Sequence, residues 1–314
     1  MKGRLEMILT VTCNPAVDKT YNTSNLMIGH VNRMREFVSL PGGKGVNVTK
    51  VLRQFGEDVV ATGFLGGYTG EFINTALNEM GVQTAFVGIR GTTRSNMNIV
   101  GDDGYVTEIL EPGPKVNRYE MDVFMDQFKE LTKTCEVVAI SGSLSEGMPK
   151  DFYAKLIKLA KENGAKVFLD TSGEPLKYGI EAAPYLVKPN RAELEYVSGR
   201  KLNSEAEIIT AAYEFIKKGV TKVVVSLGEK GLLQITKNKA IKAVPPRINA
   251  VNTVGCGDSV VAALLLGETR YFSEEDTVRF AVGISAANAL TMESGSIPQE
   301  VLDEITEKVV VVSQ

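Results

Sequence analysis

The chain has 314 residues, of which 44% are hydrophobic, and this composition suits one large globular domain. A net charge of −3, with no block of basic residues, argues against nucleic-acid and acidic-membrane partners, and the single histidine, His30, argues against most Ser-His and multi-histidine metal sites. Three widely spaced cysteines, no signal-peptide pattern and no apolar run of about 18 residues predict a cytoplasmic protein without a disulfide framework.

The first part of the chain alternates strand and helix patterns. Segments rich in β-branched residues predict strands at 7–12, 59–64 and 82–89. A turn at 13–18 is expected after the first strand, and a glycine-rich turn at 41–48 opens a helix that runs to about Phe55. A second helix is expected near 69–80.

Two polar, alternating segments, 19–40 and 92–110, do not fit a buried core. The second contains Asp102-Asp103-Gly104, a hairpin signal. We expect both segments to form a small β lid over one edge of a larger sheet. Each has one apolar side and too few residues to bury it, so the lids of two chains are expected to pack together in a homodimer.

The second part of the chain predicts more strand–helix alternation. Strands are expected at 137–140, 166–170, 185–188 and 222–226. Helices are expected at 150–163, 204–218, 255–267, 274–291 and 298–308. Short apolar strands separated by helices are typical of an α/β fold whose mostly parallel sheet is covered on both faces. No repeat or linker divides the chain, so residues 1–314 are expected to form one domain with the lid inserted in it.

The stretch 252–259 (NTVGCGDS) has the strongest chemical signal, because two glycines and Asp258 stand where a loop becomes an apolar helix. The first N–H groups of a helix lack internal partners and carry the positive end of its dipole, so they bind anions such as phosphate. An aspartate in the first turn can instead serve as a helix cap, and for an isolated motif that reading is the commoner one.

Other polar clusters follow the predicted strands, where ligands bind in open α/β sheets. They include Asp18, Ser141, Lys188, Asn190 and Ser226. Each has a purely structural alternative: Asp18 as a turn cap, Asn190 and Glu193 as a capping box, Lys44 as a solvated charge, and Gly228 with Gly231 as a tight turn. Several such clusters on one side of one sheet favour a binding site.

Three motifs in order resemble those of the ribokinase-like (pfkB-type) carbohydrate kinases: 42–47 (GGKGVN), 190–193 (NRAE) and 253–259 (TVGCGDS). The resemblance covers nearly the whole chain. The stretches 12–18, 31–33, 93–94, 141–144 and 187–190 are similar to the branch that contains 1-phosphofructokinases and tagatose-6-phosphate kinases. The resemblance implies a three-layer α/β/α fold with a β lid. It also implies a kinase that uses ATP and Mg²⁺, with a monovalent cation such as K⁺ as a further expectation. Cys256 departs from the small residue usual in the family, and Glu146 from a neutral one.

The resemblance also implies roles for individual residues at the transfer end of the site. Asp258 would be the base on the acceptor hydroxyl, and the N–H groups of the anion hole would come from Gly255, Cys256 and Gly257. Asn190 and Glu193 would act on Mg²⁺, largely through its waters. The nucleotide would be bound by Lys188, Asn190, Ser226, Gly228 and Gly231, with Asn288 nearby.

At the acceptor end, the residues implied to bind the sugar are Asp18, Gly42, Gly43, Asn47 and Ser141. Three cations would hold the phosphate that the sugar already carries: Arg33, Lys44 and Arg94. These cations favour a phosphorylated ketohexose over a free sugar or nucleoside. The residues do not decide between fructose 1-phosphate and tagatose 6-phosphate as the substrate. Residues 66–71 are more similar to 1-phosphofructokinases, and residues 107–114 to tagatose-6-phosphate kinases. We slightly favour the 1-phosphofructokinase interpretation. A non-catalytic sugar or nucleotide sensor is disfavoured, since the base, anion-hole and metal residues are all present.

Overall fold

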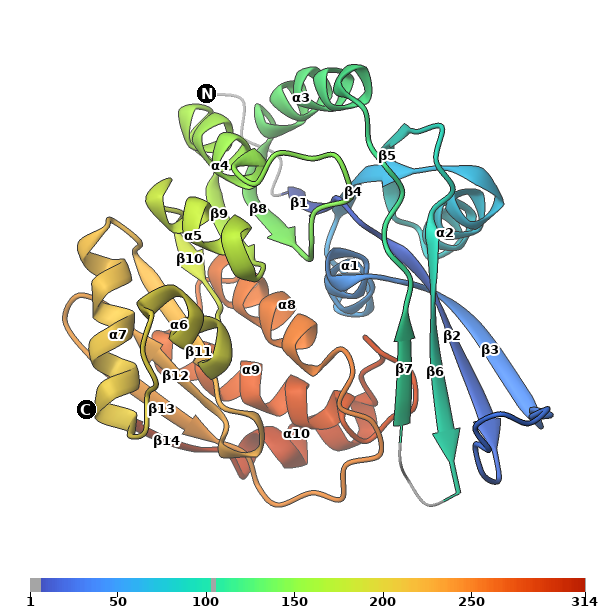
Figure 1. The fold of residues 1–314 in the computed structure, drawn as a ribbon. Helices are drawn as coiled ribbons and strands as arrows, with labels where there is room; N and C mark the ends of the chain where they lie inside the picture. The colour runs from blue at the N-terminus through green and yellow to red at the C-terminus, as the bar shows by residue number, and fades with distance from the viewer. Residues whose placement is uncertain (1–6, 103–105, 314) are drawn as a thin grey trace.

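The computed structural model describes residues 7–102 and 106–313, and two sheets form its framework (Figure 1). The larger sheet has ten strands in the order β14-β13-β12-β11-β10-β9-β8-β1-β4-β5. From β5 to β11 the neighbouring strands are parallel, and β12, β13 and β14 continue the sheet antiparallel. Their bounds are β1 Met7–Thr12, β4 Val59–Leu65, β5 Gln83–Gly88, β8 Cys135–Ser141, β9 Lys166–Asp170, β10 Leu186–Val187, β11 Lys222–Ser226, β12 Leu232–Ile235, β13 Ala240–Val244 and β14 Val310–Ser313.

Helices cover both faces of this sheet, as expected for an α/β fold. Consecutive residues of β1 pack on opposite faces of the sheet: Ile8 belongs to the hydrophobic core on one face and Leu9 to the core on the other. One face carries α3 (Arg118–Thr132), α4 (Phe152–Glu162), α5 (Gly173–Glu181), α6 (Arg191–Ser198) and α7 (Glu205–Lys217). The other carries α1 (Lys44–Gln54), α8 (Cys256–Thr269), α9 (Glu274–Asn288) and α10 (Gln299–Glu307), with α2 (Gly67–Glu79) near the lid.

The expected lid is a separate four-stranded sheet in the order β3-β2-β6-β7, which extends away from the large sheet (Figure 1). Its strands are β2 Ala16–Thr23, β3 Glu36–Gly42, β6 Arg94–Gly101 and β7 Val106–Leu110. The central pair, β2 and β6, is parallel, whereas β2–β3 and β6–β7 are antiparallel. The hairpin signal between β6 and β7 lies outside the described residues except for Asp102.

The turns that flank the lid are shorter than the sequence predicts. Asp18 lies within β2 and pairs with Leu40, so the turn expected at 13–18 ends before the strand begins at Ala16. Gly42 belongs to β3, which leaves only Gly43 between that strand and α1. Partner strands distant in sequence extend both strands, and a local pattern does not reveal those partners.

Several elements have no counterpart among the predicted ones, notably α3, α5 and the antiparallel strands β12, β13 and β14. The strands have four or five residues each, too few for a clear period. The helix expected at 274–291 ends at Asn288. Within the described residues, no helix is both long and apolar enough to cross a membrane.

Candidate active site

The start of α8 forms the centre of the site. Gly255 precedes the helix with φ of 83°, and a Cβ there would lie 3.0 Å from the Cβ of Ser294, so glycine suits both the backbone and the close approach. Asp258 lies in the first turn and is 6% exposed. Two of the expected anion-hole donors, Cys256 and Gly257, lie within α8. The N–H of Cys256 donates to the carbonyl of Thr253 at 3.3 Å, whereas no backbone hydrogen bond is described for the N–H of Gly257.

Asp258 contacts α1 across the site. The amide of Asn47 donates to Oδ2 of Asp258 at 2.9 Å. The N-cap of α8 is Gly255, and no described side-chain hydrogen bond caps this helix. Burial raises the pKa of Asp258 to about 6; the charge of Asp170 adds to the rise, while Lys44, Lys188 and Asn47 oppose it. A buried carboxyl with this pKa is ionised at neutral pH and can take up a proton, as a general base must.

A buried charge cluster lies beside Asp258. Nζ of Lys44 is 3.1 Å and Nζ of Lys188 is 3.4 Å from Oδ1 of Asp170, whose side chain is 1% exposed. Burial opposes the charge of Asp170, but the two ammonium groups outweigh it and hold its pKa below the ordinary value. A Cβ on Gly257 would lie 3.5 Å from Nζ of Lys188, so this cation stands at the start of α8.

Asp170 is a site residue that the sequence interpretation missed. It ends β9 and pairs in register with Ser141, the last residue of β8. The rule that selects Ser141 and Lys188, a polar residue at the carboxyl end of a predicted strand, selects Asp170 as well.

The base of the lid carries Asp18, one of the residues expected to bind the acceptor. The amide of Asn96 donates to Oδ1 of Asp18 at 2.9 Å, and the N–H of Gly43 also bonds to this carboxylate. A Cβ on Gly42 would lie only 1.9 Å from Oδ2 of Asp18, so only glycine fits at position 42. Asn96 was not among the expected site residues, because its pairing with Asp18 depends on the parallel contact between β2 and β6.

The three cations expected on the sugar phosphate do not converge in this structure. Lys44 belongs to the cluster with Asp170. Arg94 donates to the carbonyls of Asn14 and Glu111, at 3.2 Å each, beside the lid base. Arg33 is exposed in the loop between β2 and β3, at the end of the lid away from the large sheet (Figure 1).

Buried polar atoms without a hydrogen-bond partner gather in this region. Among the described residues there are eight such side-chain atoms, and the site holds all but those of Gln234 and Thr306: Asn14 Oδ1, Asn47 Oδ1, Arg94 Nε, Asn96 Oδ1, Ser141 Oγ and Asp170 Oδ2. Leaving buried polar groups unpaired is costly, so their concentration here indicates a place shaped for a polar ligand.

The expected nucleotide side lies at the carboxyl ends of β10 and β11. Ser226 ends β11 and bridges to Asn190, and Gly228 and Gly231 form the turn that follows. Asn288 is fully buried: its amide donates to the carbonyl of Val254 at 3.0 Å and accepts from the N–H of Gly295 at 2.9 Å. It therefore supports the loop before α8 from beneath.

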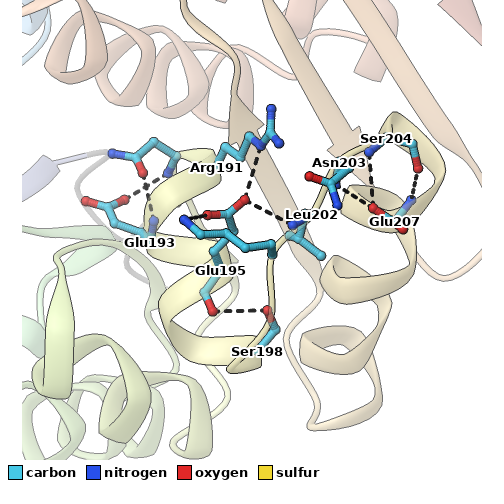
Figure 2. Close-up of polar contacts among 10 residues, drawn as sticks. Arg191, Glu193, Glu195, Ser198, Leu202, Asn203, Ser204 and Glu207 are labelled. Carbon is cyan, nitrogen blue, oxygen red and sulfur yellow. Dashed lines mark hydrogen bonds and ion pairs between the residues drawn. The ribbon is translucent and has the colours of Figure 1, made fainter.

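Asn190 and Glu193 form the capping box that was the structural alternative for this pair. Each side chain accepts from the other residue's N–H at 2.8 Å (Figure 2). Glu195 ties the same helix to the next segment, since it accepts from Lys201 at 2.9 Å and from the N–H of Leu202 at 3.0 Å. Glu193 is also close enough for its charge to raise the pKa of Lys44.

These residues fit a nucleotide and its metal ion. Two lysines bind Oδ1 of Asp170 and leave its Oδ2 unpaired, and Lys188 stands at the start of the dipole-bearing helix α8. Cations beside a helix start suit phosphate groups. Asn190 and Glu193 offer one amide and one carboxylate. Such a pair suits Mg²⁺, which keeps several waters and takes phosphate oxygens as ligands.

Comparisons with known proteins agree with this geometry. Residues 10–300 match the pfkB family carbohydrate kinases. The chain is 36% identical over 309 residues to a tagatose-6-phosphate kinase of Staphylococcus epidermidis, covering 98% of this chain and 99% of that protein. It is also 36% identical over 302 residues to the 1-phosphofructokinase of Bacillus subtilis, covering 95% and 98%.

Solved structures give the same result. The crystal structure of phosphofructokinase-2 from Escherichia coli in complex with potassium superposes with a TM-score of 0.91 at 30% identity, covering 96% of this chain and 99% of that one. Its similarity confirms the ribokinase-like fold. The chain therefore belongs to the pfkB family of carbohydrate kinases, phosphotransferases that act on an alcohol group.

Proposed function

We propose that the protein transfers the γ-phosphoryl group of ATP to a hydroxyl of a phosphorylated ketohexose, fructose 1-phosphate or tagatose 6-phosphate, and produces the bisphosphate. The observation that carries the proposal is Asp258, a buried carboxyl that Asn47 orients at the start of α8 beside two lysines. The two curated relatives act on these two kinds of substrate by their names, which supports the substrate class.

In this mechanism Asp258 takes the proton of the acceptor hydroxyl while that oxygen bonds to the γ-phosphorus and ADP leaves. ATP supplies the phosphoryl group. Asn190 and Glu193 would hold Mg²⁺, which would offset the charge on the phosphates of ATP. The N–H of Gly257 and the ammonium groups of Lys44 and Lys188 stabilise the charge on the transferring group. Asn47 keeps the carboxylate of Asp258 aimed at the hydroxyl.

The acceptor is proposed to lie between Asp258 and the lid. Asp18 accepts hydrogen bonds from the sugar hydroxyls, and the unpaired carbonyl of Asn96 accepts another. Because Lys44 pairs with Asp170, we assign it to the transferring phosphoryl group and leave Arg94 as the cation for the phosphate of the sugar. A monovalent cation such as K⁺ is a further proposed cofactor, supported by the potassium bound to the Escherichia coli relative.

The test is a coupled assay of ADP release with Mg²⁺ and ATP across fructose 1-phosphate, tagatose 6-phosphate, fructose 6-phosphate and free fructose. We expect the highest kcat/KM for one of the first two sugars. Equal kcat/KM for free and phosphorylated fructose would replace the proposal with a general sugar kinase. Sugar binding without any ADP release would leave a non-catalytic sensor.

A further inference from the structure

Lys50 is a buried cation of α1 that the proposed mechanism does not use. Its side chain is 8% exposed, and its Nζ donates to the carbonyl of Pro41 in β3 at 3.2 Å. On its other side, a Cβ on Gly295 would lie 3.0 Å from Cε of Lys50. The side chain is thus held between the lid and the loop that follows α9.

A cavity of about 220 Å³ opens beside this ammonium group, between the lid and that loop, and Asp18 of the acceptor site is part of its wall. The residues that line it are Asp18, Thr20, Asn22, Glu36, Phe37, Val38, Leu40, Lys50, Asn98, Met292, Glu293 and Ser294. Its charged groups are three carboxylates and one cation. Only one hydrogen bond from Nζ to protein is described, although an ammonium group has three donors.

Several carboxylates act on Lys50 from different elements: Asp18 from β2, Glu293 from the loop after α9 and Asp258 from α8. Glu36 of β3 lines the same cavity, and the charge of Arg94 of β6 also acts on Asp18. Without Lys50 the acceptor site would present an excess of negative charge to an anionic sugar phosphate.

We propose that Lys50 is a positioning residue of the acceptor site, whose ammonium group offsets the surrounding carboxylates and ties α1 to the lid strand so that a phosphosugar can bind. This inference rests on the proposed phosphosugar kinase activity. It concerns sugar affinity, because Lys50 donates a hydrogen bond to Pro41 and has no described hydrogen bond or ion pair with a group assigned to phosphoryl transfer.

The proposal has a consequence for pH. Burial lowers the pKa of Lys50 to about 8, and the attraction of Asp18, Glu293 and Asp258 only partly opposes this. The group is therefore charged below about pH 8 and neutral above it. Affinity for a phosphosugar should weaken as the pH rises through this value, whereas an arginine at position 50 would stay charged.

The experiment measures the dissociation constant of the phosphosugar by calorimetry, and kcat and both KM values by ADP release, for wild type, Lys50→Met and Lys50→Arg between about pH 7 and 9.5. We expect Lys50→Met to weaken sugar binding roughly tenfold or more at pH 7 with the KM for ATP unchanged. Wild type should lose affinity above about pH 8, and Lys50→Arg should not. Lys133→Met, at the C-cap of α3 and paired with Glu130, makes the same charge change and should behave as wild type.

A folded Lys50→Met protein with wild-type sugar affinity would overturn the inference. If that variant does not fold, the comparison of wild type with Lys50→Arg decides, and identical pH dependence in the two would overturn it as well. Sugar binding without ADP release would end the proposed kinase activity and leave the Lys50 comparison valid. If wild type phosphorylates the phosphosugar and Lys50→Met binds that sugar with unchanged affinity, the Lys50 inference fails while the proposed kinase activity stands.

Discussion

At the scale of single residues, the environment of Asp258 predicts how activity depends on pH. Its pKa of about 6 means that the carboxyl gains a proton as the pH falls through this value. A protonated carboxyl cannot accept the proton of the acceptor hydroxyl, so kcat/KM should decline below about pH 6. A pH profile of kcat/KM checks this, and a constant value down to about pH 4.5 would contradict the assignment of the base.

Asp258→Asn removes the base and keeps the shape of the side chain. Turnover should fall by about 10²–10⁴-fold, the usual contribution of general-base catalysis, while the KM values for ATP and sugar change little. Steady-state kinetics measure both. Asp303→Asn, in an exposed turn of α10, is the matched control, and near-normal turnover in Asp258→Asn would revive a purely structural role for the residue.

Asp170→Asn tests the charge cluster. The negative charge of Asp170 raises the pKa of Asp258, so its removal should move the acid limit of kcat/KM to lower pH. The change also takes away the carboxylate that Lys44 and Lys188 share, and misplaced lysines should reduce kcat by up to about 10²-fold. A variant whose acid limit of kcat/KM and whose kcat both match those of wild type would show that Asp170 has no part in the reaction.

Arg94→Ala tests the proposed hold on the sugar phosphate. A charge-assisted hydrogen bond contributes about 1.5–3 kcal/mol, so kcat/KM for the phosphosugar should fall roughly 10- to 150-fold with little change in the KM for ATP. Arg35→Ala is a matched control within the lid, since Arg35 pairs with Asp102 at its far end. An equal loss in both variants would point to a general defect of the lid.

At the scale of elements, α8 is anchored at both ends. Its first turn faces the site, and in its last turn Glu268 accepts from Lys166 at 2.6 Å and from Lys222 at 3.2 Å, with Tyr185 bonded to the same carboxylate. A negative charge at the carboxyl end of a helix is unfavourable, and the two lysines offset it. This cluster fixes the end of α8 that lies away from Asp258.

Glu268→Gln should therefore lower the free energy of unfolding by about 1–3 kcal/mol, with solvent at the partly exposed Lys166 favouring the lower end. Both KM values should stay the same. Denaturant unfolding measures the loss, and Glu214→Gln, which removes an exposed pair with Lys217, should cause no measurable change. Equal stability of the two variants would contradict the anchoring role.

The sequence predicted elements well where the signal is local. The turns at Gly43 and Gly255 could be identified because glycine is required at those points in the chain itself. The antiparallel strands β12 to β14 could not be identified, since they are short and owe their extended form to neighbouring strands. The role of Asn288 was also hidden, because only the fold shows that its amide is used within the protein.

The same division holds for the site. Asp258, Asn47 and Lys188 could be predicted from motifs and strand ends, and the structure brings them together. The sequence could not reveal that Lys44 pairs with Asp170 while Arg94 bonds to the carbonyls of Asn14 and Glu111, because residue types show charge and not neighbours. Asp170 could have been predicted, whereas Asn96 and Lys50 depend on contacts between distant segments.

At the scale of the whole molecule, the two faces of the lid differ. One carries Asp18 and Asn96 toward the site, while Tyr21 and Phe37 stack on the other with centroids 5.8 Å apart. Phe37 is 69% exposed and Ile109 44%. An exposed apolar face on a four-stranded sheet is typical of an interface, and we propose that it pairs with a second copy.

We expect a homodimer at micromolar concentration, measured by light scattering, because an exposed apolar face is buried when two lids pack together. Phe37→Glu should shift the protein toward monomer, since a charge would be buried in the contact. Tyr119→Glu, on a residue of α3 that is 77% exposed, is the matched control and should stay dimeric. A monomeric wild type at this concentration would refute the lid contact.

The parallel contact between β2 and β6 also has a consequence for synthesis. A ribosome releases β2 and β3 before α1, β4, α2, β5 and finally β6, so β2 must wait for its partner with one edge open. Since the bond between Asp18 and Asn96 spans this gap, a nascent chain that ends before Asn96 lacks the lid side of the proposed sugar site. The large sheet must therefore begin to assemble before the polypeptide can recognise its substrate, and a truncated product would expose an unpaired edge to other chains.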